Sequence, residues 1–139
     1  MRKNTILRIF FYCWAFPNTF IGLIITLINK ISGGEERIVS GVLEVHGAFI
    51  SLLLKRCIPL KSDALALTLG HVVLGQSLEI LERTREHERV HVKQYERYGL
   101  FFLPLYALAT LVAWMQGKRP YRDNCFEIEA YDNSTIDYF

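Results

Sequence analysis

The residues best suited to chemistry form one short run, His87-Glu88-Arg89-Val90-His91, in a segment with the composition of a helix. On a helix, side chains four positions apart project from the same face, about one turn from each other. The two imidazoles can therefore bind a single Zn²⁺ ion, with Glu88 beside them as a general base. The pattern H-E-x-x-H also arises by chance, and a surface helix with two hydrogen-bonded histidines is the alternative interpretation.

The helix around these residues is predicted from its ends and from its charge pattern. Residues 84–98 contain neither Gly nor Pro, Thr84 is a suitable N-cap, and Gly99 stands where a helix commonly ends. At about 100° per residue, both histidines share a stripe with Gln94, and the charged side chains occupy the opposite arc. We therefore expect the histidines to face the protein interior.

A third metal ligand is expected downstream, because a catalytic zinc site usually has three protein ligands and an open position. The downstream segment resembles the glutamate-bearing helix of the gluzincin metallopeptidases, and this resemblance implies Glu127 as the ligand. Glu127 and Ala130 match its E-x-x-A pattern, in which the small residue allows two helices to approach closely. Glu129 is the alternative ligand, two positions on and therefore on another face. The segment is also consistent with a short acidic helix that Asp123 or Asn124 caps, without any metal.

These motifs resemble those of the gluzincin metallopeptidases, whose third ligand often lies in an E-x-x-A pattern. The chain as a whole resembles a family of small, uncharacterised, membrane-associated bacterial proteins. This resemblance implies a zinc peptidase-like site and no particular substrate or reaction. Cys125 stands where relatives commonly carry Pro, which weakens the expected helix start and leaves the ligands unchanged. The resemblance rests on Trp14–Thr19 with Gly22, Thr68–Val72, His87–Gly99 and Tyr121–Ala130, in that order.

Length, charge and cysteine content narrow the class of protein. The chain has 139 residues, enough for one domain with a modest core, and 51% of them are hydrophobic. Sixteen basic and fourteen acidic residues give a net charge of +2, which is too balanced to favour nucleic acid as a partner. Cys13, Cys57 and Cys125 are widely spaced and odd in number, which predicts neither a disulfide framework nor a C-x-x-C metal site.

The apolar stretch from Ile6 to Ile28 is the strongest membrane signal, and Arg2, Lys3 and Lys30 flank it. We expect residues 1–30 to be a membrane anchor that contacts lipid, in the bacterial inner membrane, and residues 31–139 to be a zincin-like domain. A cleavable signal peptide is the alternative, although no clear small-x-small cleavage site follows.

Two stretches before the histidine helix have the composition of β-strands. Arg37 to Leu54 and Ala64 to Leu81 combine β-branched residues with several glycines, which disfavours long helices. A small antiparallel sheet is predicted. His71 lies inside the second stretch, either as a structural histidine or as a group near the site.

A second apolar stretch, Leu100 to Gln116, is long enough to form a short transmembrane helix. If it crossed the membrane, His91 and Glu127 would lie on opposite sides and could not share an ion. We therefore predict an interfacial helix, with Lys118 and Arg119 near lipid headgroups. The expected fold class is α+β: an anchoring helix, a small sheet, the H-E-x-x-H helix, this interfacial helix and a C-terminal helix that carries the glutamate.

The function expected from these residues is that of a membrane-associated, zinc-dependent hydrolase, most simply a metallopeptidase that acts on a peptide or protein. His87, His91 and Glu127 would bind Zn²⁺, and Glu88 would deprotonate the attacking water. Tyr121, Tyr131 and His71 are the candidates for stabilising the oxyanion. The alternatives are a non-catalytic zinc-binding membrane protein and a structural membrane protein without metal.

Overall fold

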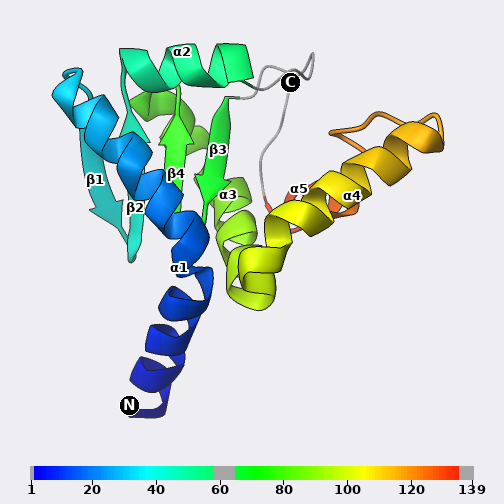
Figure 1. Ribbon diagram of the computed structural model, residues 1–139, viewed down its shortest axis with the longest axis horizontal. Coiled ribbons are helices and arrows are strands. Elements are labelled where there is room, and N and C mark those ends of the chain that lie inside the picture. The colour runs from blue at the N-terminus through cyan, green and yellow to red at the C-terminus, as the bar shows by residue number, and fades with distance from the viewer. Residues whose placement is uncertain (1, 58–64, 135–139) are drawn as a thin grey trace.

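A computed structural model of the chain describes residues 2–57 and 65–134 and shows a mixed α+β fold (Figure 1). The predicted fold class is confirmed at this level, with an apolar N-terminal helix and a small sheet ahead of the histidine helix. In chain order the elements are α1 (Arg2–Ile31), β1 (Glu35–Val39), β2 (Val42–His46), α2 (Ala48–Cys57), β3 (Ala66–Leu69), β4 (Val72–Gly75), α3 (Leu78–Tyr98), η1 (Gly99–Phe101), α4 (Phe102–Met115) and α5 (Cys125–Asp132).

The sheet is mixed, so the prediction of an antiparallel sheet is wrong for its central pair. The strand order is β1-β2-β4-β3, in which β1–β2 and β3–β4 are antiparallel hairpins and β2–β4 are parallel. Tight turns close the hairpins, with positive φ at Ser40 and Gly41 in one and at Gly70 in the other. Helix α2 lies between β2 and β3 in the chain, and β3 forms the far edge of the sheet, so that β4 lies beside β2 and runs parallel to it.

Helices replace the ends of both stretches that were expected to be extended. Helix α2 occupies Ala48–Cys57, and α3 begins at Leu78 instead of near Thr84. Ser77 is the N-cap of α3, and its side chain accepts a hydrogen bond from the backbone N–H of Ile80 at 3.3 Å. The predicted cap at Thr84 is therefore wrong, since its hydroxyl donates to the carbonyl of Ile80 one turn back. Ala64 lies outside the described residues.

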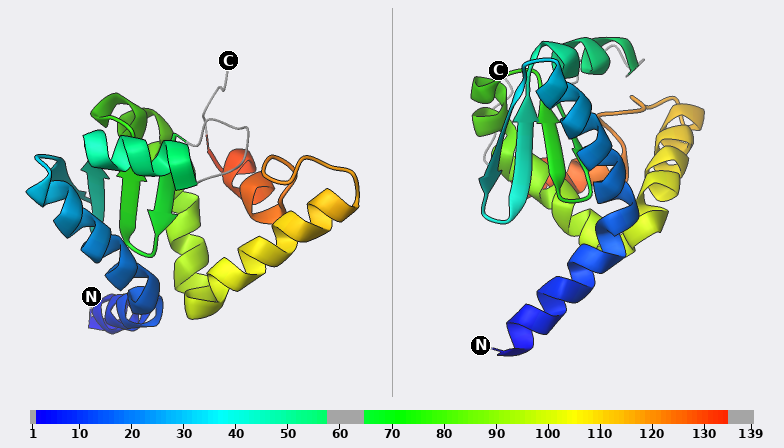
Figure 2. Two further views of the ribbon diagram at one scale, coloured as in Figure 1. Left: turned by 45° about the horizontal axis from the view of Figure 1, so that its top comes forward. Right: turned by 60° about the vertical axis from the view of Figure 1, so that its left-hand side comes forward.

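Both faces of the sheet are covered, as expected for strands that alternate their side chains. Val72 and Leu74 of β4 pack with residues of α2 on one face, where α1 also lies. Val73 points to the other face and packs against Leu81 and Val92 of α3. Figures 1 and 2 show α1 crossing one face of the sheet diagonally while α3 lies behind it. The sheet thus fixes the position of the histidine helix.

The second half of α1 is part of the folded body. Its buried positions Asn18, Gly22 and Asn29 are four and seven residues apart and form one stripe, which Ala15 continues toward the first half. A Cβ added at Gly22 would lie 2.7 Å from Cβ of Val72, so this helix approaches β4 as closely as a glycine permits. The first half of α1 extends beyond the sheet (Figure 1).

Helices α4 and α5 form an arm that leaves the body and returns to it (Figure 2). The chain turns at Gly99, where φ is 56°, and α4 then points away from the sheet. The Asn124 amide brings α5 back, because it donates to the carbonyl of Tyr106 at 3.1 Å and to the hydroxyl of Thr110 at 2.9 Å. Helix α5 consequently packs against both α3 and α4.

Two helical stretches of the described chain, Asn4–Ile31 and Leu78–Met115, are long and apolar enough to cross a membrane. A signal sequence and the core helix of a soluble protein share this length and composition. Much of the outer surface of α1 and α4 is nevertheless apolar and exposed, including Phe20, Leu27, Leu108 and Trp114.

Candidate metal centre

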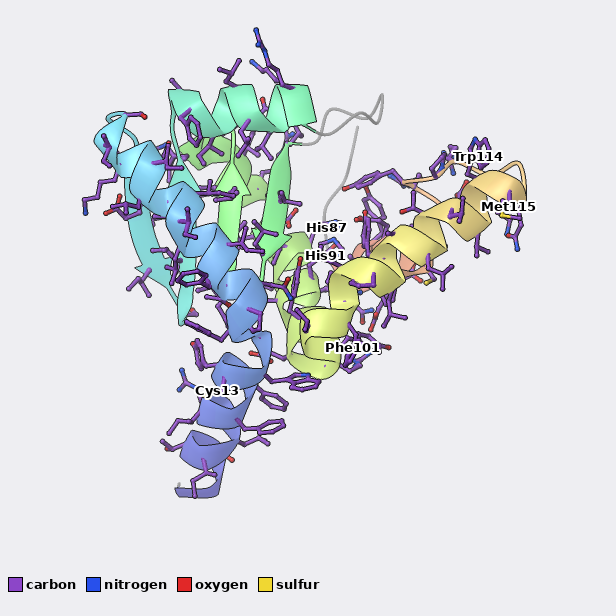
Figure 3. All side chains as sticks on the ribbon, in the orientation of Figure 1. Cys13, His87, His91, Phe101, Trp114 and Met115 are labelled. Carbon is purple, nitrogen blue, oxygen red and sulfur yellow. The ribbon has the colours of Figure 1, made fainter. Side chains whose placement is uncertain are left out.

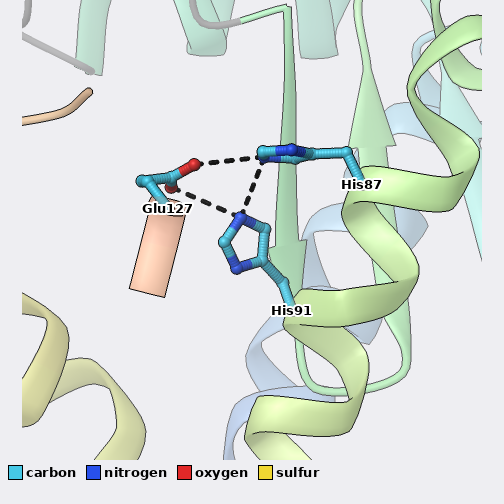
Figure 4. A group of neighbouring side chains, drawn as sticks. All are labelled: His87, His91 and Glu127. Carbon is cyan, nitrogen blue, oxygen red and sulfur yellow. Dashed lines mark hydrogen bonds and ion pairs between the residues drawn. The ribbon is translucent and has the colours of Figure 1, made fainter. Parts of the chain in front are cut away.

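His87, His91 and Glu127 meet in the interior between α3 and α5 (Figure 4). Nε2 of His87 lies 3.1 Å from Oε2 of Glu127, and Nε2 of His91 lies 3.3 Å from Oε1 of Glu127. The two Nε2 atoms are 3.2 Å apart. All three side chains are buried. The structure therefore brings together the three residues predicted as metal ligands, and the group can hold a metal ion.

The spacing of these atoms allows one ion to contact all three residues. One ligand atom from each residue lies within 4.8 Å of the other two. The two histidines contact different oxygens of Glu127, Oε2 for His87 and Oε1 for His91. Two imidazoles and one carboxylate are also the donor set of a common class of catalytic zinc site.

Gln94 fixes the ring orientation of His91 and keeps a proton on its Nδ1. Nδ1 of His91 donates to Oε1 of Gln94 at 2.8 Å, which leaves Nε2 directed toward Glu127. The Gln94 amide is itself oriented, because its Nε2 donates to the carbonyl of Phe126 at 3.0 Å and to Oε2 of Glu129 at 2.8 Å. Glu129, the alternative ligand, thus contacts Gln94 and, at 3.2 Å, Arg97, and it lies outside the group of three.

Without a metal, the site is held by an ion pair. Burial lowers the pKa of His91, but the hydrogen bond and charge of Glu127, with the charge of Glu88, outweigh it and raise that pKa from 6.5 to about 9. Burial raises the pKa of Glu127, but hydrogen bonds from His87 and His91 lower it to about 2. Tyr106 adds a further bond, since its hydroxyl donates to Oε1 of Glu127 at 2.6 Å. The metal-free site therefore carries a proton that an ion must displace.

Glu88 lies beside the ligands in a cavity of about 160 Å³. Its carboxylate is buried, and Oε2 accepts a hydrogen bond from the hydroxyl of Thr68 at 2.6 Å. The hydroxyl of Tyr95 donates to the carbonyl of the same threonine at 3.0 Å. The cavity has room for more than one water molecule. Its walls come from β3, α3, α4, α5 and the segment between the last two helices: Ala66, Leu67, Thr68, Glu88, His91, Tyr95, Phe102, Leu103, Tyr106, Tyr121 and Glu127.

The three candidates for oxyanion stabilisation lie in different places. Tyr121 lines the cavity with Glu88 and His91, and burial, together with the charges of Glu127 and Glu88, raises its pKa, so the phenol keeps its proton as a donor. The ring of Tyr131 lies 4.7 Å from that of His87. His71 is outside the cavity lining. Its ring stacks 4.1 Å from Tyr12, and its Nε2 lies 2.9 Å from Oε1 of Glu96. His71 therefore joins α1 to the sheet and α3, as expected for a structural histidine.

Thr68 and Tyr106 are neighbours of the site that no sequence motif predicted. Thr68 comes from an edge strand, and no local spacing relates it to Glu88. Tyr106 lies in the apolar helix α4, where a tyrosine hydroxyl among mainly aliphatic residues was the available signal. Gln94 was placed on the histidine face, and the three-residue interval explains its contact with His91.

Comparison with protein-family models, curated proteins and solved structures finds no match to this chain. The interpretation of the site therefore rests on its own geometry. Figure 3 shows His87 and His91 on the side of α3 that faces the arm formed by α4 and α5.

Proposed function

We propose that this protein is a membrane-associated, zinc-dependent hydrolase, with a peptide or protein as substrate. The observation that carries the proposal is Glu88, a buried carboxylate that shares one cavity with His91 and Glu127. A purely structural metal site is closed by its ligands and has no use for a base or for open space. The resemblance to gluzincin metallopeptidases supports the same conclusion.

The roles of the residues follow from their contacts. His87, His91 and Glu127 are the residues that would hold Zn²⁺, which when bound lowers the pKa of water and polarises a carbonyl group. Glu88 accepts the proton of the attacking water as general base and returns it to the leaving amine. Thr68 keeps the Glu88 carboxylate oriented through its hydrogen bond, and Tyr121 donates to the oxyanion.

Membrane association is the second part of the proposal. Helix α1 provides the anchor, and α4 lies in the interface of the same membrane without crossing it. The exposed apolar residues of both helices support this arrangement, because water would otherwise cover them at a cost of about 25 cal/mol per Å². The resemblance to small, membrane-associated bacterial proteins is the reason for assigning the protein to the bacterial inner membrane.

A non-catalytic zinc protein is the second candidate function. The mutual contacts of His87, His91 and Glu127 favour it equally, since they describe metal binding and no reaction. The two functions differ in their need for Glu88: a hydrolase requires it as general base, and a non-catalytic zinc protein does not.

The first experiment measures zinc in the purified protein and in His91→Ala. We expect one zinc per chain in the wild type and a loss of most of it in the variant, because a neutral methyl group replaces a ligand. His46→Ala is the matched control, since His46 lies on β2 with Glu35 as its neighbour, away from the site. Zinc absent from the wild type, or retained in His91→Ala, contradicts the metal site.

The second experiment compares Glu88→Gln with Glu127→Gln on a set of unfolded proteins and peptides. Glu88→Gln should retain zinc and lose about 10²–10⁴-fold in rate, because an amide of nearly equal size cannot accept the proton. Glu127→Gln should lose zinc. Hydrolysis that persists in Glu88→Gln excludes the proposed mechanism, and a zinc-loaded wild type that hydrolyses none of these substrates favours the non-catalytic function.

A further inference from the structure

Two grooves meet where α1, the end of α3 and the start of α4 come together, away from the metal site. The basic groove has a volume of about 520 Å³ and is lined by Phe10, Phe11, Trp14, Lys93, Glu96 and Arg97. The apolar groove has a volume of about 470 Å³ and is lined by Trp14, Arg97, Tyr98, Phe101, Pro104, Leu105 and Leu108. Trp14 and Arg97 belong to both, so the two grooves adjoin each other.

The basic groove carries positive charge toward solvent. Lys93 is exposed and forms no ion pair within residues 2–57 and 65–134. Arg97 has a side chain that is 57% exposed, although it lies 3.2 Å from Glu129. The acidic member of the groove, Glu96, already contacts His71 at 2.9 Å. Lys93 is thus available to an anion at this end of α3, and the exposed guanidinium of Arg97 can contact an anion while it stays paired with Glu129.

The apolar groove exposes large hydrophobic side chains beside these cations. Phe101 is 61% exposed and Leu108 is 56% exposed, and Phe10 in the adjoining groove is 57% exposed. Figure 3 shows Phe101 at the junction of α3 and α4, near the point where α1 crosses. A ligand that covers both grooves must therefore combine a negative group with a long apolar part.

We propose that the two grooves bind one anionic phospholipid. Its phosphate lies between Lys93 and Arg97 in the basic groove, and an acyl chain lies along Trp14, Phe101 and Leu108 in the apolar groove. Charge complementarity selects an anionic lipid over a zwitterionic one, and the aromatic rings of α1 are side chains typical of the headgroup level. The site is separate from the metal centre, so the proposal stands whether or not the protein is a hydrolase.

The test uses the full chain in non-ionic detergent micelles, titrated with phosphatidylglycerol or with phosphatidylcholine of the same acyl composition. Lipid retained after gel filtration is measured by phosphorus analysis. We expect a preference of about 30-fold for phosphatidylglycerol, since each of the two cations near a lipid headgroup contributes about fivefold. The double variant Lys93→Gln/Arg97→Gln should reduce this preference to about onefold. Arg83→Gln, which removes an exposed cation elsewhere on α3, should leave it unchanged.

A second pair of variants tests the apolar groove. Leu108→Gln should reduce retention of both lipids, whereas Leu111→Gln should not, because Leu111 is also exposed on α4 but lies outside the groove. Each variant is accepted only if its thermal unfolding matches the wild type. Equal retention of the two lipids, a preference that survives the double variant, or full displacement of the lipid by millimolar inorganic phosphate would overturn the proposal. A lipid-free dimer whose contact Leu108→Gln disrupts would show instead that a second copy covers the groove.

Discussion

Gln94 accepts a hydrogen bond from Nδ1 of His91 at 2.8 Å and is itself fixed by the carbonyl of Phe126 on α5. One amide therefore sets the orientation of a metal ligand on α3 and ties it to the helix that carries Glu127. The ligands are held by neighbours that do not bind the metal themselves, and these neighbours are testable separately from the ligands.

Replacing Gln94 with Leu should weaken zinc binding by about 10–100-fold, because His91 loses the acceptor that fixes its ring and tautomer. Competition with a chelator of known affinity measures the effect. Gln116→Leu is the matched control, since Gln116 is exposed at the end of α4. An affinity within twofold of the wild type in Gln94→Leu would show that the hydrogen bond does not support the site.

Tyr106→Phe should lower the free energy of unfolding of the metal-free protein by about 1.5–3 kcal/mol, the usual loss for a hydrogen bond to a charged group. The hydroxyl of Tyr106 donates to the buried carboxylate of Glu127 at 2.6 Å. Tyr12→Phe provides the comparison, because its hydroxyl donates to the neutral carbonyl of Gly41 at 2.7 Å. In denaturant unfolding, Tyr12→Phe should lower the free energy of unfolding by only about 0.5–1.5 kcal/mol, because the lost hydrogen bond has a neutral acceptor. Equal losses in the two variants would argue against an ionised Glu127.

The metal-free protein should be most stable between about pH 4.5 and 6.5. The pKa of His91 is raised from 6.5 to about 9, so its contribution is complete below 6.5 and is lost as pH rises through 9. The pKa of Glu127 is lowered from 4.5 to about 2, so its contribution is present above 4.5 and is lost as pH falls through 2. Thermal unfolding in the presence of a chelator measures this profile. A stability that rises steadily from pH 6.5 to 9 would exclude the ion pair.

Zinc affinity should rise between about pH 6.5 and 9, the range in which the stability of the metal-free protein falls. Zinc requires the unprotonated Nε2 of His91, whose proton is lost only near pH 9. Each unit of pH from about 6.5 to 9 should therefore tighten zinc binding about tenfold, as one proton is released per ion. Proton release measured by calorimetry in two buffers checks the stoichiometry, and an affinity independent of pH would contradict it.

The sequence predicted the local parts of the site well and the non-local parts less well. His87 and His91 share a face because helix geometry alone relates positions four apart, and Glu127 followed from a recognisable motif. The parallel pairing of β2 with β4 depends on the path of α2, a segment whose apolar residues do not distinguish a strand from a short buried helix. The contact of Thr68 with Glu88 depends in turn on the pairing of β2 with β4, because this strand order places β3 beside α3.

Gly22→Ala should destabilise the protein by about 1–3 kcal/mol, the range for an overpacked interior. The new methyl group would lie 2.7 Å from Cβ of Val72, and neither backbone can move without displacing α1 from the sheet. Leu23→Ala is the control on the same helix, because Leu23 is 41% exposed and faces outward. Its effect in detergent should stay within about 0.5 kcal/mol. If Gly22→Ala unfolds with the wild-type midpoint, α1 is not docked on the sheet as described.

The last prediction concerns the side of the membrane on which the two ligand helices lie. Helices α3 and α5 pack together, so cysteines placed at exposed positions on each must face the same aqueous compartment. We would replace Cys13, Cys57 and Cys125 with Ser and introduce one cysteine at Arg83 of α3 or at Asp132 of α5. A membrane-impermeant maleimide applied to sealed vesicles should label both positions before lysis, or both only after it. Labelling of one position before lysis and the other only after it would mean that α4 crosses the bilayer. His91 and Glu127 could then not bind one ion, and the metal site would be excluded together with the interfacial position of α4.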